Sequence, residues 1–228
     1  MTKRKKLIIF SASAVLLAAA VAIFGGILFP ERASALGFTS FTLAAVCLAF
    51  VCFELSRSTV LEISLVAVMT ALSVCGRVLF YPIAFFKPVS AIVILCGLWL
   101  GPFAGLICGG LSAIVSGIFF GYGLWLPFQV LAWGLIGLFA GLLRRPMKKS
   151  RIILCLYGAF SGVFFSAFMD IFTVFSFGSE FNFSMYSAAL LSALPITAVY
   201  AVSNVIFLLA LARPIGKKLD RVLSPGGK

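Results

Sequence analysis

Histidine is absent from this chain of 228 residues, and only six residues are acidic. Protein metal sites and acid–base catalysts are built mainly from His, Cys and carboxylate side chains. The cysteines all fall within apolar stretches and form no C-x-x-C pair, so we expect buried thiols without disulfides. We therefore predict a protein that is not an enzyme and holds neither a metal nor a cofactor. The six cysteines are Cys47, Cys52, Cys75, Cys96, Cys108 and Cys155.

The G-x-x-x-x-G-K-[S/T] loop that cradles nucleotide phosphates is also missing. Gly216-Lys217 is a Gly-Lys pair, but the required upstream glycine is not present. If the protein takes part in an ATP-driven process, another polypeptide has to hydrolyse the ATP.

Apolar residues, by contrast, are abundant. They make up 63% of the chain, which contains 25 Phe and has a mean hydropathy of +1.20. Soluble domains are closer to half apolar, and a run of about 18 apolar residues is long enough for a membrane span. We predict an all-α integral membrane protein with eight spans. They cover about 7–29, 37–56, 59–80, 88–100, 102–120, 128–143, 152–176 and 187–212.

The basic residues set the predicted orientation. The net charge is +12, but no basic face alternates with aromatic residues, so we expect no nucleic-acid partner. With both termini cytoplasmic, 15 of the 18 basic residues lie on the cytoplasmic side, as the positive-inside rule requires. The exceptions are Arg32, Arg77 and Lys87. The fifteen are Lys3, Arg4, Lys5, Lys6, Arg57, Arg144, Arg145, Lys148, Lys149, Arg151, Arg213, Lys217, Lys218, Arg221 and Lys228.

Three parts make up the predicted organisation. Residues 1–57 hold a basic start and two additional N-terminal transmembrane helices, 58–213 form a six-helix membrane domain, and 214–228 form a basic cytoplasmic tail. A cleaved signal peptide is the alternative for the first span, because Ala33-Ser34-Ala35 resembles a cleavage site. The apolar run is about twice the usual length of a signal core, which favours a retained span.

Small residues recur at every fourth position along 101–121 and form one stripe of a helix. This spacing favours close helix packing within the chain. Ala67 and Ala71 have the same spacing and serve either internal packing or a partner protein in the membrane. Asn204 is expected to make an interhelical hydrogen bond. The stripe consists of Gly101, Gly105, Gly109, Ala113, Gly117 and Gly121, followed by Gly137 and Gly141 in the next span.

Polar and aromatic residues gather at the outer ends of the spans. An ionisable residue within a span usually lines a cavity or meets a partner, so Arg77 and Asp170 either pair or frame a ligand pocket. The alternative is that Arg77 and Lys87 extend to the headgroups while the aromatic residues form an interfacial belt. The candidate binding residues are Arg77, Tyr81, Lys87, Tyr122, Trp125, Gln129, Trp133 and Asp170.

Three stretches between about residues 60 and 212 resemble one known family. They are the A-x-x-x-A at Ala67 and Ala71, the stretch from Arg77 to Lys87 with KPVSAIVI, and the block FFGYGLWLPFQVLAWGLIGLFAGLL. Together they resemble the substrate-binding (S) component of energy-coupling factor (ECF) vitamin transporters.

Within that family, the block is most similar to S components assigned to cobalamin. These have a G-x-G-P-W-T-P-like loop before a W/F-Q pair, and Leu124 and Leu126 replace its Pro and Thr. The matching residues are Gly121, Gly123, Trp125, Pro127, Phe128 and Gln129.

The resemblance implies a six-helix core with both termini cytoplasmic, and outer loops that cover a pocket. These loops correspond to 81–87, 121–127 and 177–186. It further implies that the helix with Ala67 and Ala71 docks on a transmembrane coupling subunit that carries two cytoplasmic ATPases. The S component is thought to topple in the membrane as it carries its vitamin inward.

We therefore predict a substrate-specific subunit of an ATP-driven vitamin uptake transporter in the bacterial cell membrane, with a corrinoid favoured as the vitamin-like small molecule. Two alternatives are a secondary transporter of a small organic solute and a non-transporting assembly subunit. A secondary transporter usually places carboxylates or broken helices near mid-membrane, where Asp170 is the one candidate.

Overall fold

The regular structure in the described part of the chain is α-helical. The computed structural model describes residues 59–177 and 181–224 and scattered positions between 13 and 47. The basic start, most of the two predicted N-terminal spans, the Ala33-Ser34-Ala35 sequence and Glu180 lie outside the described residues. The two additional helices, the total of eight spans and the position of the termini therefore stay predictions.

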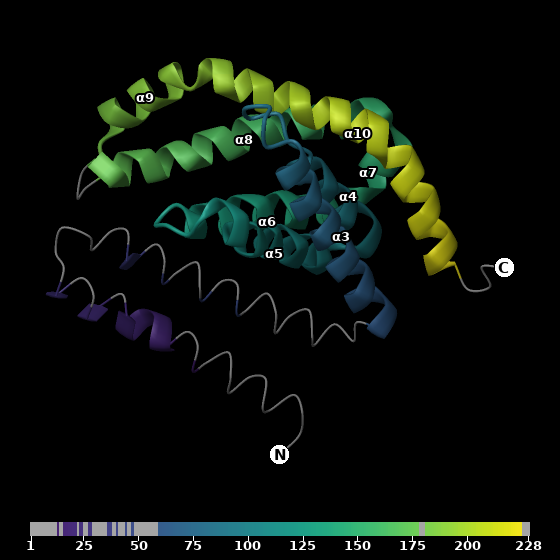
Figure 1. The fold of residues 1–228 in the computed structure, drawn as a ribbon, viewed down its shortest axis with the longest axis horizontal. Coiled ribbons are helices and arrows are strands. Elements are labelled where there is room, and N and C mark those ends of the chain that lie inside the picture. The colour runs from purple at the N-terminus through teal and green to yellow at the C-terminus, as the bar shows by residue number, and fades with distance from the viewer. Residues whose placement is uncertain are drawn as a thin grey trace.

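Four helices in this part of the chain are long and apolar enough to cross a membrane: α3 (Val60–Leu79), α5 (Pro102–Phe120), α8 (Arg151–Phe177) and α10 (Leu194–Leu223). Figure 1 shows their arrangement. The protein is thus an all-α membrane protein. The shorter helices are α4 (Val89–Leu100), α6 (Leu126–Leu142), α7 (Arg144–Lys149) and α9 (Phe183–Ser192).

The start of α3 follows from two polar residues. The Thr59 hydroxyl accepts a hydrogen bond from the Glu62 amide (3.2 Å), and the Glu62 carboxylate accepts one from the Thr59 amide (2.9 Å). This reciprocal cap satisfies amides that have no partner within the helix. It fixes the entry of the chain into the first helix of the core.

The predicted span 187–212 corresponds to two helices in the structure, and the second helix extends beyond its predicted end. It is divided into α9 and α10, because Pro195 lacks a backbone N–H and lies in the first turn of α10. Beyond the predicted end, α10 continues through Pro214 to Leu223 and includes much of the expected tail. The basic run that begins at Arg144 forms the short helix α7.

Helix α4 lies at the centre of the described core. Every residue from Val89 to Leu98 is buried, so the helix has no lipid-facing side. A helix that is apolar all round and buried all round belongs to the interior of a bundle. Its neighbours α8 and α10 are joined by the hydrogen bond that Asn204 Nδ2 donates to the Gly158 carbonyl (3.1 Å), as expected from the sequence.

Backbone contact between α5 and α6 confirms the predicted role of the small residues. A Cβ atom on Gly105 would lie 2.3 Å from the Gly137 carbonyl oxygen, and one on Gly109 would lie 2.3 Å from the Trp133 carbonyl oxygen. Gly101 and Gly121 act differently. Each ends a helix with a positive φ angle (100° and 82°), a backbone conformation that favours glycine.

Replacing Gly109 by Ala is expected to destabilise the protein, because the new methyl group meets backbone that cannot move aside. Overpacking of this kind costs about 1–3 kcal/mol. The thermal unfolding midpoint in detergent should fall by several degrees. Gly110→Ala is the matched control, since its Cβ would lie 3.5 Å from a Val130 methyl group, an ordinary contact. Equal midpoints for the two variants would contradict the proposed packing.

Candidate functional site

Arg77 lies near the C-terminal end of α3, with its guanidinium group among aromatic rings. Its central carbon lies 4.5 Å from the centroid of the Phe120 ring and 4.9 Å from that of Trp133. The Nη1 atom donates a hydrogen bond to Ser116 Oγ. An arginine over aromatic faces gains cation–π attraction that grows as water is excluded. The side chain is thus half-buried against the aromatic rings of the bundle.

Lys87 brings a second cation to the same rings. Its Nζ atom lies 5.8 Å from the Phe120 ring centroid and 5.9 Å from that of Tyr81. Tyr81 in turn packs on Phe120 at a centroid distance of 5.4 Å. Burial lowers the pKa of the Lys87 ammonium group, and the positive charge of Arg77 lowers it further. The two cations thus share one aromatic surface.

A chain of aromatic contacts leads from Arg77 to α8 and α10. The Trp133 ring is stacked on Phe165 at 5.0 Å with an interplanar angle of 9°, and Phe165 meets Tyr200 edge-on at 5.2 Å. With Phe120 of α5, five helices (α3, α5, α6, α8 and α10) therefore contribute to one site.

The loop between α3 and α4 is anchored on one side and free on the other. The Phe86 ring lies 5.0 Å from that of Phe207, and the Ser203 hydroxyl donates a hydrogen bond to the Lys87 carbonyl (3.2 Å). Phe85 adopts a φ of 60°, which non-glycine residues seldom do, and packs edge-on against Tyr200 at 5.7 Å. Tyr81 and Phe85 stay exposed beside the Arg77 site.

The three candidates around the start of α6 have different environments. The Tyr122 hydroxyl donates a hydrogen bond to the Ile114 carbonyl (3.1 Å), and its ring packs against Gly117, so Tyr122 secures the loop on α5. Trp125 is partly exposed and meets Phe172 edge-on at 6.4 Å. Gln129 is half-buried one turn before Trp133 on α6. The binding role of all these residues stays a prediction.

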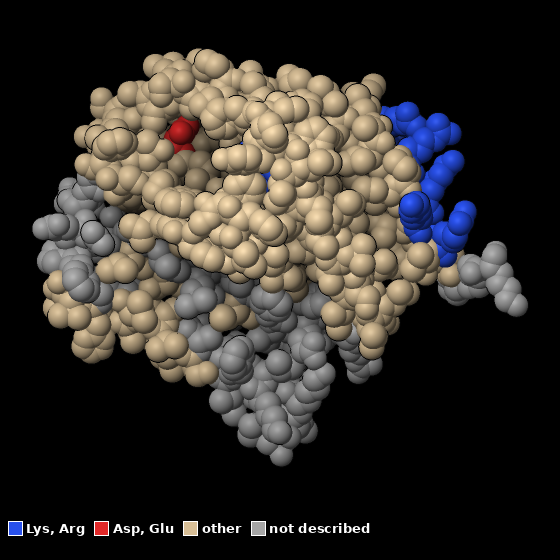
Figure 2. All heavy atoms as spheres, in the orientation of Figure 1, with Lys and Arg blue, Asp and Glu red and all other residues tan. Residues whose placement is uncertain are grey.

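Asp170 does not pair with Arg77. The structure shows no ion pair between these two described residues, and the Asp170 Oδ2 atom is buried without a hydrogen-bond partner. Figure 2 shows that basic groups gather at one end of the described molecule. The structure thus shows no pairing of Asp170 with Arg77, and the ligand-pocket role of Asp170 stays a prediction.

Four aromatic residues at the site were not among the candidates from the sequence: Phe85, Phe120, Phe165 and Tyr200. The sequence offers 25 Phe, and nothing in their spacing separates the residues at this site from those that face lipid. The one available signal was the position of Phe120 directly before Gly121, at the start of the loop already singled out.

An apolar cavity of about 670 Å³ lies on the other face of α3. It is lined by residues such as Leu72, Phe119, Phe207 and Leu211, with no charged side chain among them. A ligand site normally adds a few placed polar groups to an apolar wall. The Arg77 site meets this condition and the cavity does not.

Comparison with known proteins gives one result. A family model described as the ECF-type riboflavin transporter, S component, matches residues 57–220, which is about seven-tenths of the chain. The match covers every described helix from α3 through most of α10. No curated protein and no solved structure gives a significant match.

The Lys87 ammonium group is expected to titrate below the ordinary lysine value of 10.5, because burial disfavours its charged form and Arg77 repels it. The folded protein then holds this proton less tightly than the unfolded chain. Burial of the charged Lys87 therefore lowers the free energy of unfolding at low pH, and this loss becomes smaller as pH rises toward 10.5. The ¹³Cε chemical shift of lysine-labelled protein reports the midpoint, and Lys87→Arg assigns the signal. Arg77→Gln should raise the midpoint. A midpoint at or above 10.5 in the wild type would contradict the burial of this group.

Proposed function

Because this chain belongs to the family of ECF-type riboflavin transporter S components, we propose that it captures a vitamin-like solute at the outer face of a bacterial cell membrane and delivers it inward. The family is one of transporter subunits, so the protein is a transporter subunit and not an enzyme. Family membership also argues against the secondary-transporter and assembly-subunit alternatives.

The observation that carries the proposal is the grouping of Arg77 and Lys87 on shared aromatic rings. Both cations lie close to Phe120, while exposed Tyr81 and Phe85 flank the site from the adjoining loop. Exposed aromatic faces suit a flat conjugated ring, and half-buried cations suit its carbonyl or phosphate oxygens. The site thus supports a solute that combines a large ring system with polar groups.

Two candidates share this chemistry. Riboflavin follows from the description of the matched family, and a corrinoid follows from the similarity of residues 121–129 to the cobalamin-type loop. The family match does not support the corrinoid in particular. We therefore propose only the class of solute, and a binding experiment distinguishes the two candidates.

Delivery requires an external energy source. We propose that a transmembrane coupling subunit with two cytoplasmic ATPases provides it, and that α3 forms the contact. Ala67 and Ala71 are exposed on α3, as are Val68 (61%) and Leu72 (41%), whereas Val66 and Met69 face the core. A flat face of small residues lets another helix approach closely.

Binding of the solute by the purified full chain tests the proposal. Riboflavin or cobalamin, added in detergent, should co-elute with the protein on a sizing column and be seen by its absorbance. Arg77→Gln should weaken binding by about tenfold or more, as expected for loss of a charge-assisted contact worth about 1.5–3 kcal/mol. Arg145→Gln, an exposed arginine outside the site, is the control.

The outcomes separate the parts of the proposal. Retention of one solute identifies the substrate. If the Arg77→Gln variant retains the solute as well as the wild type does, the binding site does not include Arg77. Folded protein that retains neither solute would argue against both candidates.

Docking through α3 is tested with the double substitution Ala67→Leu and Ala71→Leu. Two larger side chains on the flat face should block close approach, so less coupling subunit should co-purify, while solute binding stays at the wild-type level. Ala198→Leu, at an exposed alanine of α10, controls for added bulk in the lipid. Full recovery of the complex with the double variant would rule out this face as the contact.

A further inference from the structure

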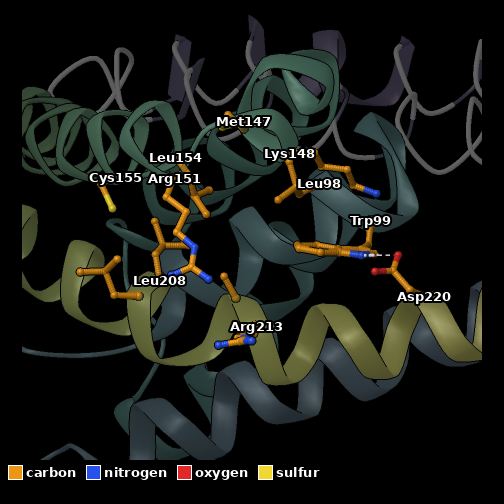
Figure 3. A pocket seen from close by; sticks show the side chains of 12 residues that line it. Leu98, Trp99, Met147, Lys148, Arg151, Leu154, Cys155, Leu208, Arg213 and Asp220 are labelled. Carbon is orange, nitrogen blue, oxygen red and sulfur yellow. Dashed lines mark hydrogen bonds between the residues drawn. The ribbon is translucent and has the colours of Figure 1, made fainter.

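A pocket of about 280 Å³ opens at the basic end of the described molecule (Figure 2). Residues of α4, α7, α8 and α10 line it, so it lies where the C-terminal end of α4 meets the N-terminal end of α8. Figure 3 shows Arg151 and Arg213 projecting into it from α8 and α10, with Lys148 beside Trp99. The pocket is separate from the Arg77 site, which lies at the opposite ends of these helices.

The positive charge of this pocket is not neutralised within the described residues. Asp220 is the one acidic residue in the lining, and its carboxylate accepts a hydrogen bond from Trp99 Nε1 (2.8 Å). Lys148 Nζ lies 4.9 Å from the centroid of the Trp99 ring. Neither Arg151 nor Arg213 forms an ion pair within the described part of the chain. Lys148, Arg151 and Arg213 outnumber the one carboxylate of the lining, and two guanidinium groups that face one hollow provide a site for an anion.

The wall beside these arginines is formed by the Trp99 ring. Its Nε1 atom donates a hydrogen bond to Asp220, and the ring packs against Gly216, where a Cβ atom would lie 2.4 Å from it. These two contacts position Trp99 at the pocket.

An apolar groove of about 380 Å³ continues from the pocket between α8 and α10. The two hollows share Arg151, Cys155 and Leu209. From there the groove follows the helices toward the middle of the membrane, and its surface is open: Leu156 is 66% exposed and Leu209 is 57% exposed. The other lining residues are Ile152, Ala159 and Val205.

We propose that the pocket and groove together bind one anionic phospholipid. The phosphate lies between Arg151 and Arg213, and an acyl chain lies along the groove past Cys155 and Ala159. A free phosphate or a nucleotide would use the cations but leave the groove empty. Basic pockets between membrane helices on the cytoplasmic side are suited to lipid headgroups of this kind, and the predicted orientation places this end in the cytoplasmic leaflet.

The test uses the purified full chain and native mass spectrometry with a defined lipid series. Dioleoyl phosphatidylglycerol should bind with a one-to-one stoichiometry, and dioleoyl phosphatidylcholine should bind more weakly. The double variant Arg151→Gln and Arg213→Gln should bind phosphatidylglycerol about 30-fold more weakly, at about 1 kcal/mol for each charge near the surface. Arg144→Gln with Arg145→Gln removes two exposed arginines outside the pocket and should weaken binding much less than the pocket double variant does. Arg151→Lys with Arg213→Lys keeps the charge and should retain most of the binding.

Two further measurements separate the lipid from a free anion. Glycerol 1-phosphate carries the headgroup phosphate without acyl chains and should not compete at the same concentration. Ala159→Trp fills the groove and should weaken lipid binding, whereas Ile153→Trp adds the same bulk to another face of α8 and should not. Equal affinity for the two lipids in the wild type would overturn the proposal. So would wild-type binding by the glutamine double variant, while full competition by glycerol 1-phosphate would replace the lipid with a free anion.

Discussion

The direct backbone contact between α5 and α6 is the constraint on which the rest of the core depends. Gly109 lies against the carbonyl group of Trp133, so the contact that joins the helices also fixes the residue whose ring meets Arg77. Phe120, at the end of the same α5, provides the second ring. A larger residue at Gly105 or Gly109 would separate the helices and the two rings with them. The packing of α5 on α6 therefore also positions the two aromatic rings of the candidate site.

The charges of the described chain are sorted toward two ends, and this suits a body that lies largely in lipid. The basic residues of α7 and the end of α10 face water or headgroups (Figure 2). Arg77 is shielded from lipid by aromatic rings, and its polar contact is to Ser116 inside the bundle. A charge within a span is costly unless it lines a cavity or has a partner. The aromatic rings and Ser116 give Arg77 such partners in the last turn of α3.

Much of the fold could be predicted from hydropathy, because the bounds of α3, α4 and α5 lie within a few residues of the expected spans. The break at Ala193 falls within one expected span, because hydropathy does not show whether packing restores a helix next to a proline. Arg77 was found because an arginine is rare in an apolar span. Phe120 and Tyr200 were not, since their importance comes from contacts between distant segments. The Trp99–Asp220 hydrogen bond joins residues 121 positions apart, so no local sequence pattern could predict it.

The central position of α4 connects the two ends of the molecule physically. Lys87 directly precedes Pro88, the residue that caps α4, and Trp99 lies in its last turn, about 18 Å away at 1.5 Å per residue. Helix α4 is buried on every side and contacts α3, α5, α6, α8 and α10. A shift of α4 would therefore disturb its packing against all of these helices. By contrast, Tyr81 and Phe85 in the loop before α4 are exposed. The architecture thus places exposed aromatic side chains at the candidate site and a cationic pocket at the other end of the same buried helix.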